Sequence, residues 1–324
     1  IIYNIIMYIL GIETSCDDTC MGIIKVENDH WSILGNYRYS HIEKCAKYQG
    51  IVPEVVAREH VDKIDVLLDL ILTENHLNIT DISYIGVTVA PGLIGSLLVG
   101  YYFALTLSKR FNIPLVPVHH IEAHLLVMNP KYPCDGLLIS GGHTMLIHME
   151  SFGKYTILSN TIDDSIGEFF DKVGRAIGLE YPAGKYIQDN ANPYITKSPL
   201  PIPIPHSNNF SFSGLKTACI NLIPSYSMED ICAFMQITTT KILNQKLKKY
   251  SKYPLYIGGG VSSNTYIRSN LLHDYEIIYP PLDLCTDNGV MICVAAYEYI
   301  KNIPNIINSN IVPSSNIPIT EWHK

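Results

Sequence analysis

The sequence predicts an α/β protein with two lobes. At 324 residues the chain exceeds the usual size of a single hydrophobic core, so we expect two domains of roughly 100–200 residues each. Hydrophobic residues make up 47% of the chain and charged residues 16%, which is typical of a packed protein and not of a disordered one. Apolar strands that end in small-residue loops alternate with helical patterns along the chain, and the first set reads βββαβα.

The first third of the chain supplies that set of elements. Residues 8–15 and 20–27 favour β-structure and flank the turn CDDT, which predicts a hairpin. Residues 53–76 place apolar side chains at helical spacing after a proline that suits a first helical turn. A strand at 83–90, a Gly-rich turn and a helix through 96–111 are expected to follow.

The remaining chain repeats this plan. Residues 115–128 read as a strand that passes into a helix, and residues 135–149 as a strand, a Gly-Gly turn and a strand. Residues 255–272 read as a strand, a Gly-rich turn and a helix.

These patterns suggest the limits of the two lobes. We expect an N-terminal lobe at 7–116 and a C-terminal lobe at 117–303. The stretch 182–210 is rich in Pro and Asn and predicts an irregular insertion in the second lobe. The tail at 304–324 is expected to be extended and to pack back on the N-terminal lobe.

Charge and hydropathy restrict the possible partners. The formal net charge of −7 gives no overall attraction to nucleic acid, so a polyanion needs a local basic patch. The apolar runs are broken by Pro and Gly below the ~18–20 residues of a membrane span, and the eight cysteines occur singly, which fits a reducing compartment. A basic stretch at 241–252 suits either tRNA or a solvated helix face; its lysines are Lys241, Lys246, Lys248, Lys249 and Lys252.

Two histidines, His120 and His124, lie four positions apart in a predicted helix, with Glu122 between them. Two imidazoles on one helix face can share a metal ion, but a complete site needs a further ligand, usually a carboxylate. The alternatives are packing on a buried helix and a zinc peptidase. A peptidase is disfavoured because its HExxH signature places the glutamate directly after the first histidine.

Other polar groups follow the predicted strands. The turn at 13–19 carries Asp17 and Asp18, which suit either local capping or a phosphate approached through a hydrated cation. The Gly-rich turns at 139–144 and 257–264 expose backbone amides that phosphate or ribose can approach. Asp287 precedes a predicted helix, where it is either a cap or the missing carboxylate ligand of the histidines.

Eight stretches, in order, resemble the tRNA N6-adenosine threonylcarbamoyltransferase family in its bacterial and organellar branch. They are LGIETSCDDT, APGLIGSLLVG, PVHHIEAHLL, SGGHT, DDSIGEFFDKVGRAIGLEYP, FSFSGLKTA, GGGVSSN and CTDNGVMI. The likeness runs from residue 7 to residue 296, and FSFSGLKTA with HHIEAH is the most specific part. The resemblance implies an actin-like, sugar-kinase-like ATPase fold: two lobes, each on a βββαβα core, with nucleotide in the cleft.

The resemblance also implies an activity. This family transfers a threonylcarbamoyl group from threonylcarbamoyl-adenylate to N6 of adenosine 37 in tRNAs that read codons beginning with A. The chain is then expected to bind tRNA and the adenylate, and to work as a homodimer or with accessory proteins of the same pathway. We expect a bacterial-type cytoplasmic enzyme, with a mitochondrion or another organelle as the alternative compartment.

Carried over to this sequence, the resemblance makes His120, His124 and Asp287 the metal ligands, with Glu122 either orienting the histidines or lying behind them. The ion would be iron or zinc, and magnesium is an option beside the nucleotide. Asp17 or Asp18 is our candidate for accepting the proton of the attacking amine. The positions that match the family's adenylate contacts are Leu138, Ile139, Ser140, Gly141, Gly142, Asp171, Gly184 and Asn264.

The chain departs from the family pattern at a few positions. Ala183 and Lys185 stand where the family commonly has glycine and proline, and Ala90 stands where a glycine precedes PGL. A methyl group at position 183 bears directly on the contact assigned to Gly184. Three rival functions are a small-molecule kinase or ATPase on the same fold, a metallopeptidase, and a scaffold that binds nucleotide without catalysis.

Overall fold

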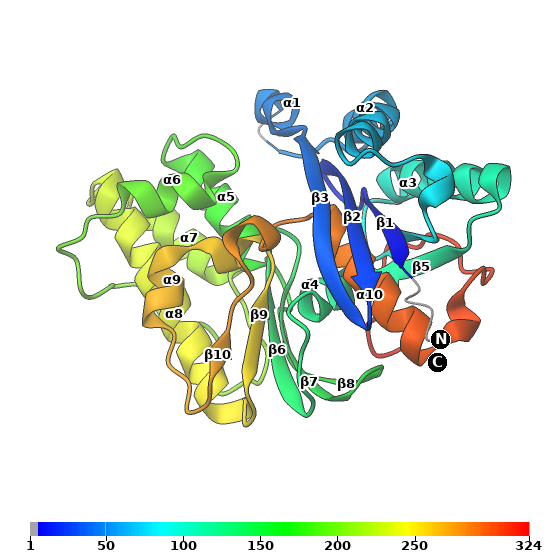
Figure 1. Ribbon diagram of the computed structural model, residues 1–324. Coiled ribbons are helices and arrows are strands. Elements are labelled where there is room, and N and C mark those ends of the chain that lie inside the picture. The colour runs from blue at the N-terminus through cyan, green and yellow to red at the C-terminus, as the bar shows by residue number, and fades with distance from the viewer. Residues whose placement is uncertain (1–5, 49, 324) are drawn as a thin grey trace. The chain divides into compact units, whose positions relative to one another are not determined.

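The computed structural model describes residues 6–48 and 50–323 (Figure 1). The chain divides into two compact units. Unit 1 comprises Ile1–Asn129 and Asp287–Lys324, and unit 2 comprises Pro130–Thr286. The chain therefore leaves unit 1 once and returns to it at Asp287.

Unit 1 is built on a five-stranded mixed sheet in the order β3-β2-β1-β4-β5. β1 pairs antiparallel with β2 and parallel with β4, and β4 pairs parallel with β5. The predicted hairpin and the predicted strand at 83–90 are thus confirmed. The strands are β1 (Met7–Glu13), β2 (Asp18–Glu27), β3 (His30–Ser40), β4 (Tyr84–Ala90) and β5 (Leu115–His119).

Helices cover this sheet. α2 packs against α3 and β2, while α10 packs against β1, β2, β4 and β5; Figure 1 shows α10 beside β1 and β2. The contact of α10 with β2 is very close, because a β-carbon at Gly289 would lie 1.9 Å from the backbone nitrogen of Gly22. The helices are α1 (Ile42–Lys47), α2 (Pro53–Glu74), α3 (Ile94–Phe111), α4 (His120–Leu126) and α10 (Gly289–Asn302), with 3-10 turns at Ile79–Asp81 and Pro304–Ile306.

The limits of unit 1 differ from the lobe boundaries expected at 116/117 and 303. β5 belongs to unit 1 because it pairs with β4, and α10 belongs there because it covers the same sheet. The C-terminal segment then runs along these strands: the amide of Asn308 donates to the carbonyl of Leu115 (2.7 Å), and the amide of Ser314 to that of Val89 (2.9 Å).

Unit 2 repeats the same sheet. Its order is β10-β9-β6-β7-β8. Read from the β8 edge, the strands are the third, second, first, fourth and fifth of the unit in chain order. This is the same arrangement as in unit 1. β6 pairs antiparallel with β7 and parallel with β9. The strands are β6 (Cys134–Ile139), β7 (Thr144–Ser151), β8 (Lys154–Asn160), β9 (Leu255–Gly258) and β10 (Ile277–Ile278).

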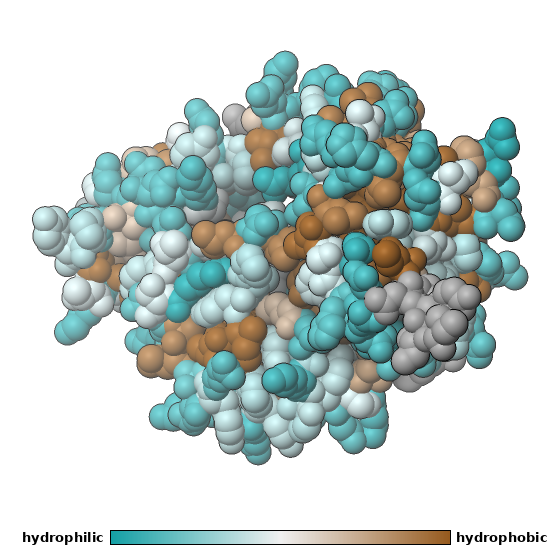
Figure 2. All heavy atoms as spheres, in the orientation of Figure 1, coloured by the Kyte–Doolittle hydropathy of each residue, from teal (hydrophilic) through white to brown (hydrophobic). Residues whose placement is uncertain are grey.

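The helices of unit 2 pack around an aromatic core that includes Phe169, Phe170, Phe210 and Phe212. The stretch 182–210 contains α6 and then irregular chain, which Phe210 anchors in that core. Figure 2 shows that hydrophilic side chains predominate on the visible face over α6. The helices are α5 (Ile166–Ala176), α6 (Ala183–Asn190), α7 (Ser213–Leu222), α8 (Met228–Tyr250) and α9 (Thr265–Asn270), with 3-10 turns at Gly260–Ser263 and Leu282–Leu284.

Over residues 6–48 and 50–323, none of the helices combines the length and the apolar character needed to cross a bilayer.

Candidate active site

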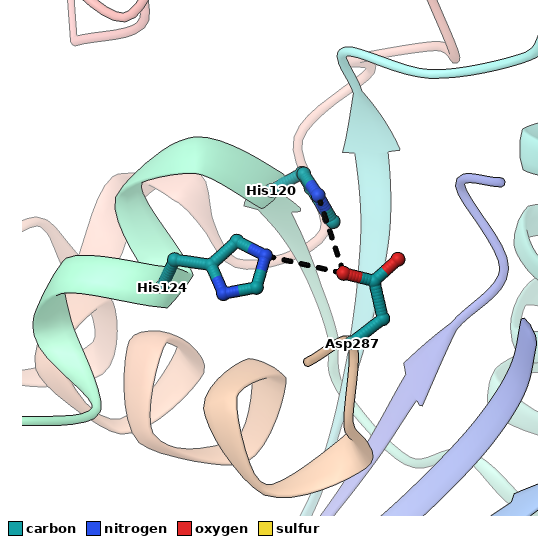
Figure 3. Close-up of side chains that lie close together, drawn as sticks. All are labelled: His120, His124 and Asp287. Atoms are coloured by element: carbon teal, nitrogen blue, oxygen red, sulfur yellow. Dashed lines mark hydrogen bonds and ion pairs between the residues drawn. The ribbon is translucent and has the colours of Figure 1, made fainter. Parts of the chain in front are cut away.

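Three side chains of unit 1 converge at the edge of its sheet (Figure 3). His120 and His124 stand one turn apart on α4, which begins directly after β5, and Asp287 lies just before α10. The Nε2 atom of His124 lies 3.2 Å from Oδ1 of Asp287, and Nε2 of His120 lies 3.7 Å from the same oxygen. One donor atom from each residue falls within 4.8 Å of the others, so the arrangement can hold a metal ion.

Glu13, at the end of β1, holds His120 from the other side. Its Oε2 lies 3.1 Å from Nδ1 of His120, and the Ser15 hydroxyl lies 3.1 Å from the same nitrogen. Thr88 donates a hydrogen bond to Glu13, which fixes the carboxylate. A carboxylate partner keeps the proton on Nδ1 and leaves Nε2 as the ligand atom. The sequence motifs did not predict this role for Glu13.

Glu122 has different contacts from those expected of a residue that orients the histidines. The Tyr299 hydroxyl donates to its Oε2, and Nε2 of His323 lies 2.9 Å from Oε1. Tyr299 belongs to α10 and His323 to the C-terminal segment. Glu122 therefore ties the histidine-bearing helix to two segments distant in sequence, and Glu13 takes the orienting role at His120.

The electrostatics of the site favour a positive charge among its carboxylates. Burial acts to lower the pKa of His120, but the charges of Glu13 and Asp287 outweigh it and raise this pKa to about 9. Burial acts to raise the pKa values of Asp287 and Glu13, and the adjacent imidazolium of His120 brings both below their usual range. Buried Glu13 and half-buried Asp287 thus both lie beside a cation, and the donor set of two imidazoles and the Asp287 carboxylate fits a divalent metal ion.

The turn between β1 and β2 carries two further carboxyl groups, those of Asp17 and Asp18. Burial and the charge of Asp287 raise the pKa of Asp17. Burial and the charge of Asp17 raise the pKa of Asp18 to about 7, although Arg38 lies 3.6 Å from its carboxylate. A carboxyl group that titrates near neutral pH is suited to proton transfer.

A chain of hydrogen bonds supports this turn. Nε2 of His60 donates to the carbonyl of Cys16 (3.0 Å), so Nδ1 of the neutral ring accepts from the Thr19 hydroxyl (2.7 Å). The Thr19 oxygen in turn accepts from Nε2 of His41 (2.9 Å). Burial lowers the pKa of His60 and brings that of His41 to about 4, so both rings are neutral at pH 7 and the donor order is fixed.

The Thr19 hydroxyl is the shared member of this chain, and its removal leaves two buried imidazole nitrogens without their partner. We expect Thr19→Val to lower the free energy of unfolding by about 1–3 kcal/mol, because unsatisfied buried polar groups are costly. Thr19→Ser keeps the hydroxyl and is expected to lose less. Urea unfolding of the three proteins measures this, and equal midpoints for the valine variant and the wild type would contradict the assigned role.

In unit 2, two Gly-rich turns lie at one edge of the sheet. β6 and β9 are parallel neighbours, so the residues after their carboxyl ends, Ser140–Gly142 and Gly259–Ser263, emerge on the same side. A β-carbon at Gly141 or Gly142 would meet no atom within 4 Å, so the outer side of this turn is open. Leu138 and Ile139 are fully buried in β6, which leaves the turn itself to face outward.

The other positions matched to adenylate contacts have structural partners. Oδ1 of Asp171 accepts from the amide of Ala183 (2.7 Å), beside Gly184 at the start of α6. The Ala183 methyl is accommodated because residue 174 is glycine, where a β-carbon would lie 2.3 Å from that methyl. Asn264 caps α9 through the amide of Ile267 (2.9 Å).

The basic stretch of α8 is not uniform. Lys246 is only 4% exposed, and its ammonium donates to the carbonyl of Ser207. It therefore does not share a surface with the other lysines, because the irregular segment at 204–207 covers its side of the helix. The exposed members of the stretch are Lys241, Lys248, Lys249 and Lys252.

The duplicated strand order of the two five-stranded sheets defines a protein of the actin-like ATPase fold, here with a His-His-Asp group. Two solved structures share this fold. Component A of (R)-2-hydroxyglutaryl-CoA dehydratase from Acidaminococcus fermentans superposes with a TM-score of 0.57 at 15% identity, covering 91% of this chain and 98% of that one. HypF from T. kodakarensis gives 0.58 at 12% identity, covering 94% and 48%.

A family model described as tRNA N6-adenosine threonylcarbamoyltransferase (TsaD) matches residues 32–294, and the chain belongs to this family. The protein of that name from Francisella philomiragia is 40% identical over 322 residues, covering 91% of this chain and 95% of the relative. The one from Fusobacterium nucleatum is 40% identical over 326 residues, covering 92% and 93%. The chain is thus a tRNA-modifying acyltransferase, and this decides against the kinase, peptidase and scaffold alternatives.

Proposed function

We propose that this transferase takes the threonylcarbamoyl group from threonylcarbamoyl-adenylate and attaches it to N6 of adenosine 37, in tRNAs that read codons beginning with A. We further propose that His120, His124 and Asp287 hold one divalent metal ion for this reaction. The observation that supports the metal is the convergence of these three residues, with donor atoms within 4.8 Å, in a chain of this family.

The donor set bears on the identity of the metal. Two imidazoles and one carboxylate suit iron or zinc, whereas magnesium prefers oxygen ligands and would come with the nucleotide. When bound, the ion supplies Lewis-acid stabilisation of the negative charge that develops on the substrate oxygens as AMP leaves. Glu13 keeps Nε2 of His120 directed to this position through its contact with Nδ1 (3.1 Å).

The remaining residues bind the donor and move the proton. The open turn at Ser140–Gly142 and the start of α6 at Gly184 present backbone to the adenylate. The exocyclic amine of adenosine must lose a proton during attack, and Asp18 is our acceptor because its pKa of about 7 matches neutral pH. Asp17, the neighbouring carboxyl, raises this pKa by its charge.

The partners and the compartment belong to the same proposal. tRNA is the substrate of this family. We propose that the chain acts as a homodimer or together with accessory proteins of the pathway, in the cytoplasm of a bacterial-type cell. Its curated relatives from Francisella and Fusobacterium support the bacterial assignment.

Metal removal tests the role of the triad. We expect chelation to lower formation of the modified nucleoside on the order of 100-fold, and Fe²⁺ or Zn²⁺ to restore it while Mg²⁺ alone does not. Metal content is measured in the same samples by mass spectrometry. Full activity in protein shown to be free of iron and zinc would contradict the proposed metal.

A further inference from the structure

A hollow in unit 2 lies apart from the residues assigned to metal and adenylate. Its volume is about 710 Å³, and its walls come from the C-terminal half of α8, from α9 and from residues 270–274. Figure 1 shows α8 and α9 lying side by side in this unit. Four of the lining residues matter for its chemistry: Lys241, Lys248, Tyr266 and Leu272.

Hydrogen bonds hold the walls of the hollow in place. Nδ2 of Asn244 donates to the carbonyl of Asn270 (2.9 Å), and Oδ1 of Asn244 accepts from the amide of Leu272 (2.8 Å). The Ser251 hydroxyl donates to buried Asp135 (2.7 Å) and so accepts from Nε2 of His273 (2.8 Å). The hollow is thus already formed in the free protein, which reduces the ordering cost of binding.

The charge of the hollow favours an anion. Lys241 and Lys248 are seven residues apart on one face of α8, about 10 Å along the helix axis. Among the described residues, neither ammonium has a carboxylate partner within 4.0 Å. Asp274 is the single acidic lining residue. Four exposed lysines lie within 241–252 although the net charge of the chain is −7, so this stretch offers cations to a polyanion.

Aromatic and apolar surface adjoins these cations. Tyr266 and Leu272 line the hollow, and Leu272 is an exposed residue, with a relative accessibility of 70%. Cations that follow a phosphate backbone, together with surface on which a base can stack, are the features by which proteins bind unpaired nucleic acid. A small phosphate compound would use the lysines but would not need an exposed apolar wall.

We propose that this hollow docks an unpaired segment of the tRNA substrate. Lys241 and Lys248 contact successive phosphates, Tyr266 and Leu272 contact a base, and the exposed Lys249 and Lys252 extend the positive surface. This inference rests on the proposed function, because it assigns a place on the chain to the substrate of that reaction. None of the residues assigned to the metal or to the adenylate lines the hollow.

Binding of unmodified tRNA, measured without catalysis, tests the docking site. The variant is Lys241→Ala with Lys248→Ala in the full chain. The matched control is Lys131→Ala with Lys197→Ala, which removes the same charge from exposed positions of unit 2 outside the hollow. We expect the lysine variant to raise the Kd for tRNA roughly 10-fold or more. The slope of log binding constant against log salt concentration should become shallower by about 1.5–2, because two phosphate contacts are lost. The control should keep both values.

A second pair of variants tests the base contact. Tyr266→Ala should weaken tRNA binding several-fold, since stacking contributes about 1–3 kcal/mol per base, and Tyr266→Phe should retain it. Unchanged Kd and salt slope in the lysine variant would overturn the inference. The inference would also be overturned if ATP or inorganic phosphate bound in the hollow without changing the Kd for tRNA. If tRNA binds with the expected salt response while the wild type forms no modified nucleoside, the proposed function fails and the docking site stands.

Discussion

Asp287→Asn is expected to lower transfer activity on the order of 100-fold or more and to release the metal from the purified protein. The carboxylate Oδ1 is the atom nearest to both histidine donors, 3.2 Å from Nε2 of His124 and 3.7 Å from Nε2 of His120. An amide has nearly the same shape but carries no charge, so it is a much weaker ligand for a divalent ion. The change therefore isolates ligation from packing.

Metal content per chain and nucleoside formation are measured together for this variant. Asp283→Asn is the matched control, because it makes the same chemical change four residues earlier at an exposed position. We expect the control to keep both metal and activity. An Asp287→Asn protein that retains a full equivalent of metal and wild-type activity would remove Asp287 from the metal centre.

Gly289→Ala is expected to lower the free energy of unfolding by about 3 kcal/mol or more. The added β-carbon would lie 1.9 Å from the nitrogen of Gly22 and 2.1 Å from the carbonyl carbon of Met21. Both contacts are with backbone, so α10 must move away from β2, and overpacking of this kind is costly. Asp287 lies two residues before this contact, so metal affinity should fall as well.

Urea unfolding measures this effect. Gly214→Ala serves as the control, because a β-carbon at Gly214 meets no atom within 4 Å, and we expect its stability to stay within about 0.5 kcal/mol of the wild type. Equal unfolding midpoints for Gly289→Ala and the wild type would contradict the close backbone contact between α10 and β2.

Local sequence patterns predicted much of the fold for physical reasons, whereas the full set of three metal-ligand candidates came from the family resemblance. Strands such as β1 and β4 are short apolar runs bounded by turn residues, and α2 has clear helical spacing after Pro53, so local pattern suffices for these elements. Membership of a unit depends instead on long-range pairing. β5 and α10 join the first sheet through contacts that no local pattern encodes.

The partners of the metal-ligand candidates show the same limit. Glu13 could have been inferred, because β1, β4 and β5 are parallel and Glu13, Thr88 and His120 lie at or near their carboxyl ends, but this needs the strand order. Glu122 meets Tyr299 and His323, which are 177 and 201 positions away. Such contacts arise only when the chain returns to unit 1.

Lys246 illustrates a third limit. In the sequence it is one of five lysines within twelve positions, and charge pattern does not distinguish it from its neighbours. Its burial depends on the segment at 204–207, whose carbonyls accept from its ammonium. The open turn at Ser140–Gly142, in contrast, was predictable, since a Gly-Gly pair directly after an apolar strand marks a loop.

One assay tests the central claim, that this chain is a transferase whose activity depends on the His-His-Asp group. The purified wild type and a His120→Ala, His124→Ala variant are each incubated with an enzyme that generates threonylcarbamoyl-adenylate, threonine, bicarbonate, ATP and unmodified tRNA, with and without bacterial accessory proteins. The modified nucleoside is detected by mass spectrometry. We predict product from the wild type and none above background from the variant. Equal product from both would contradict the metal centre, and no product from the wild type under either condition would contradict the transferase assignment itself.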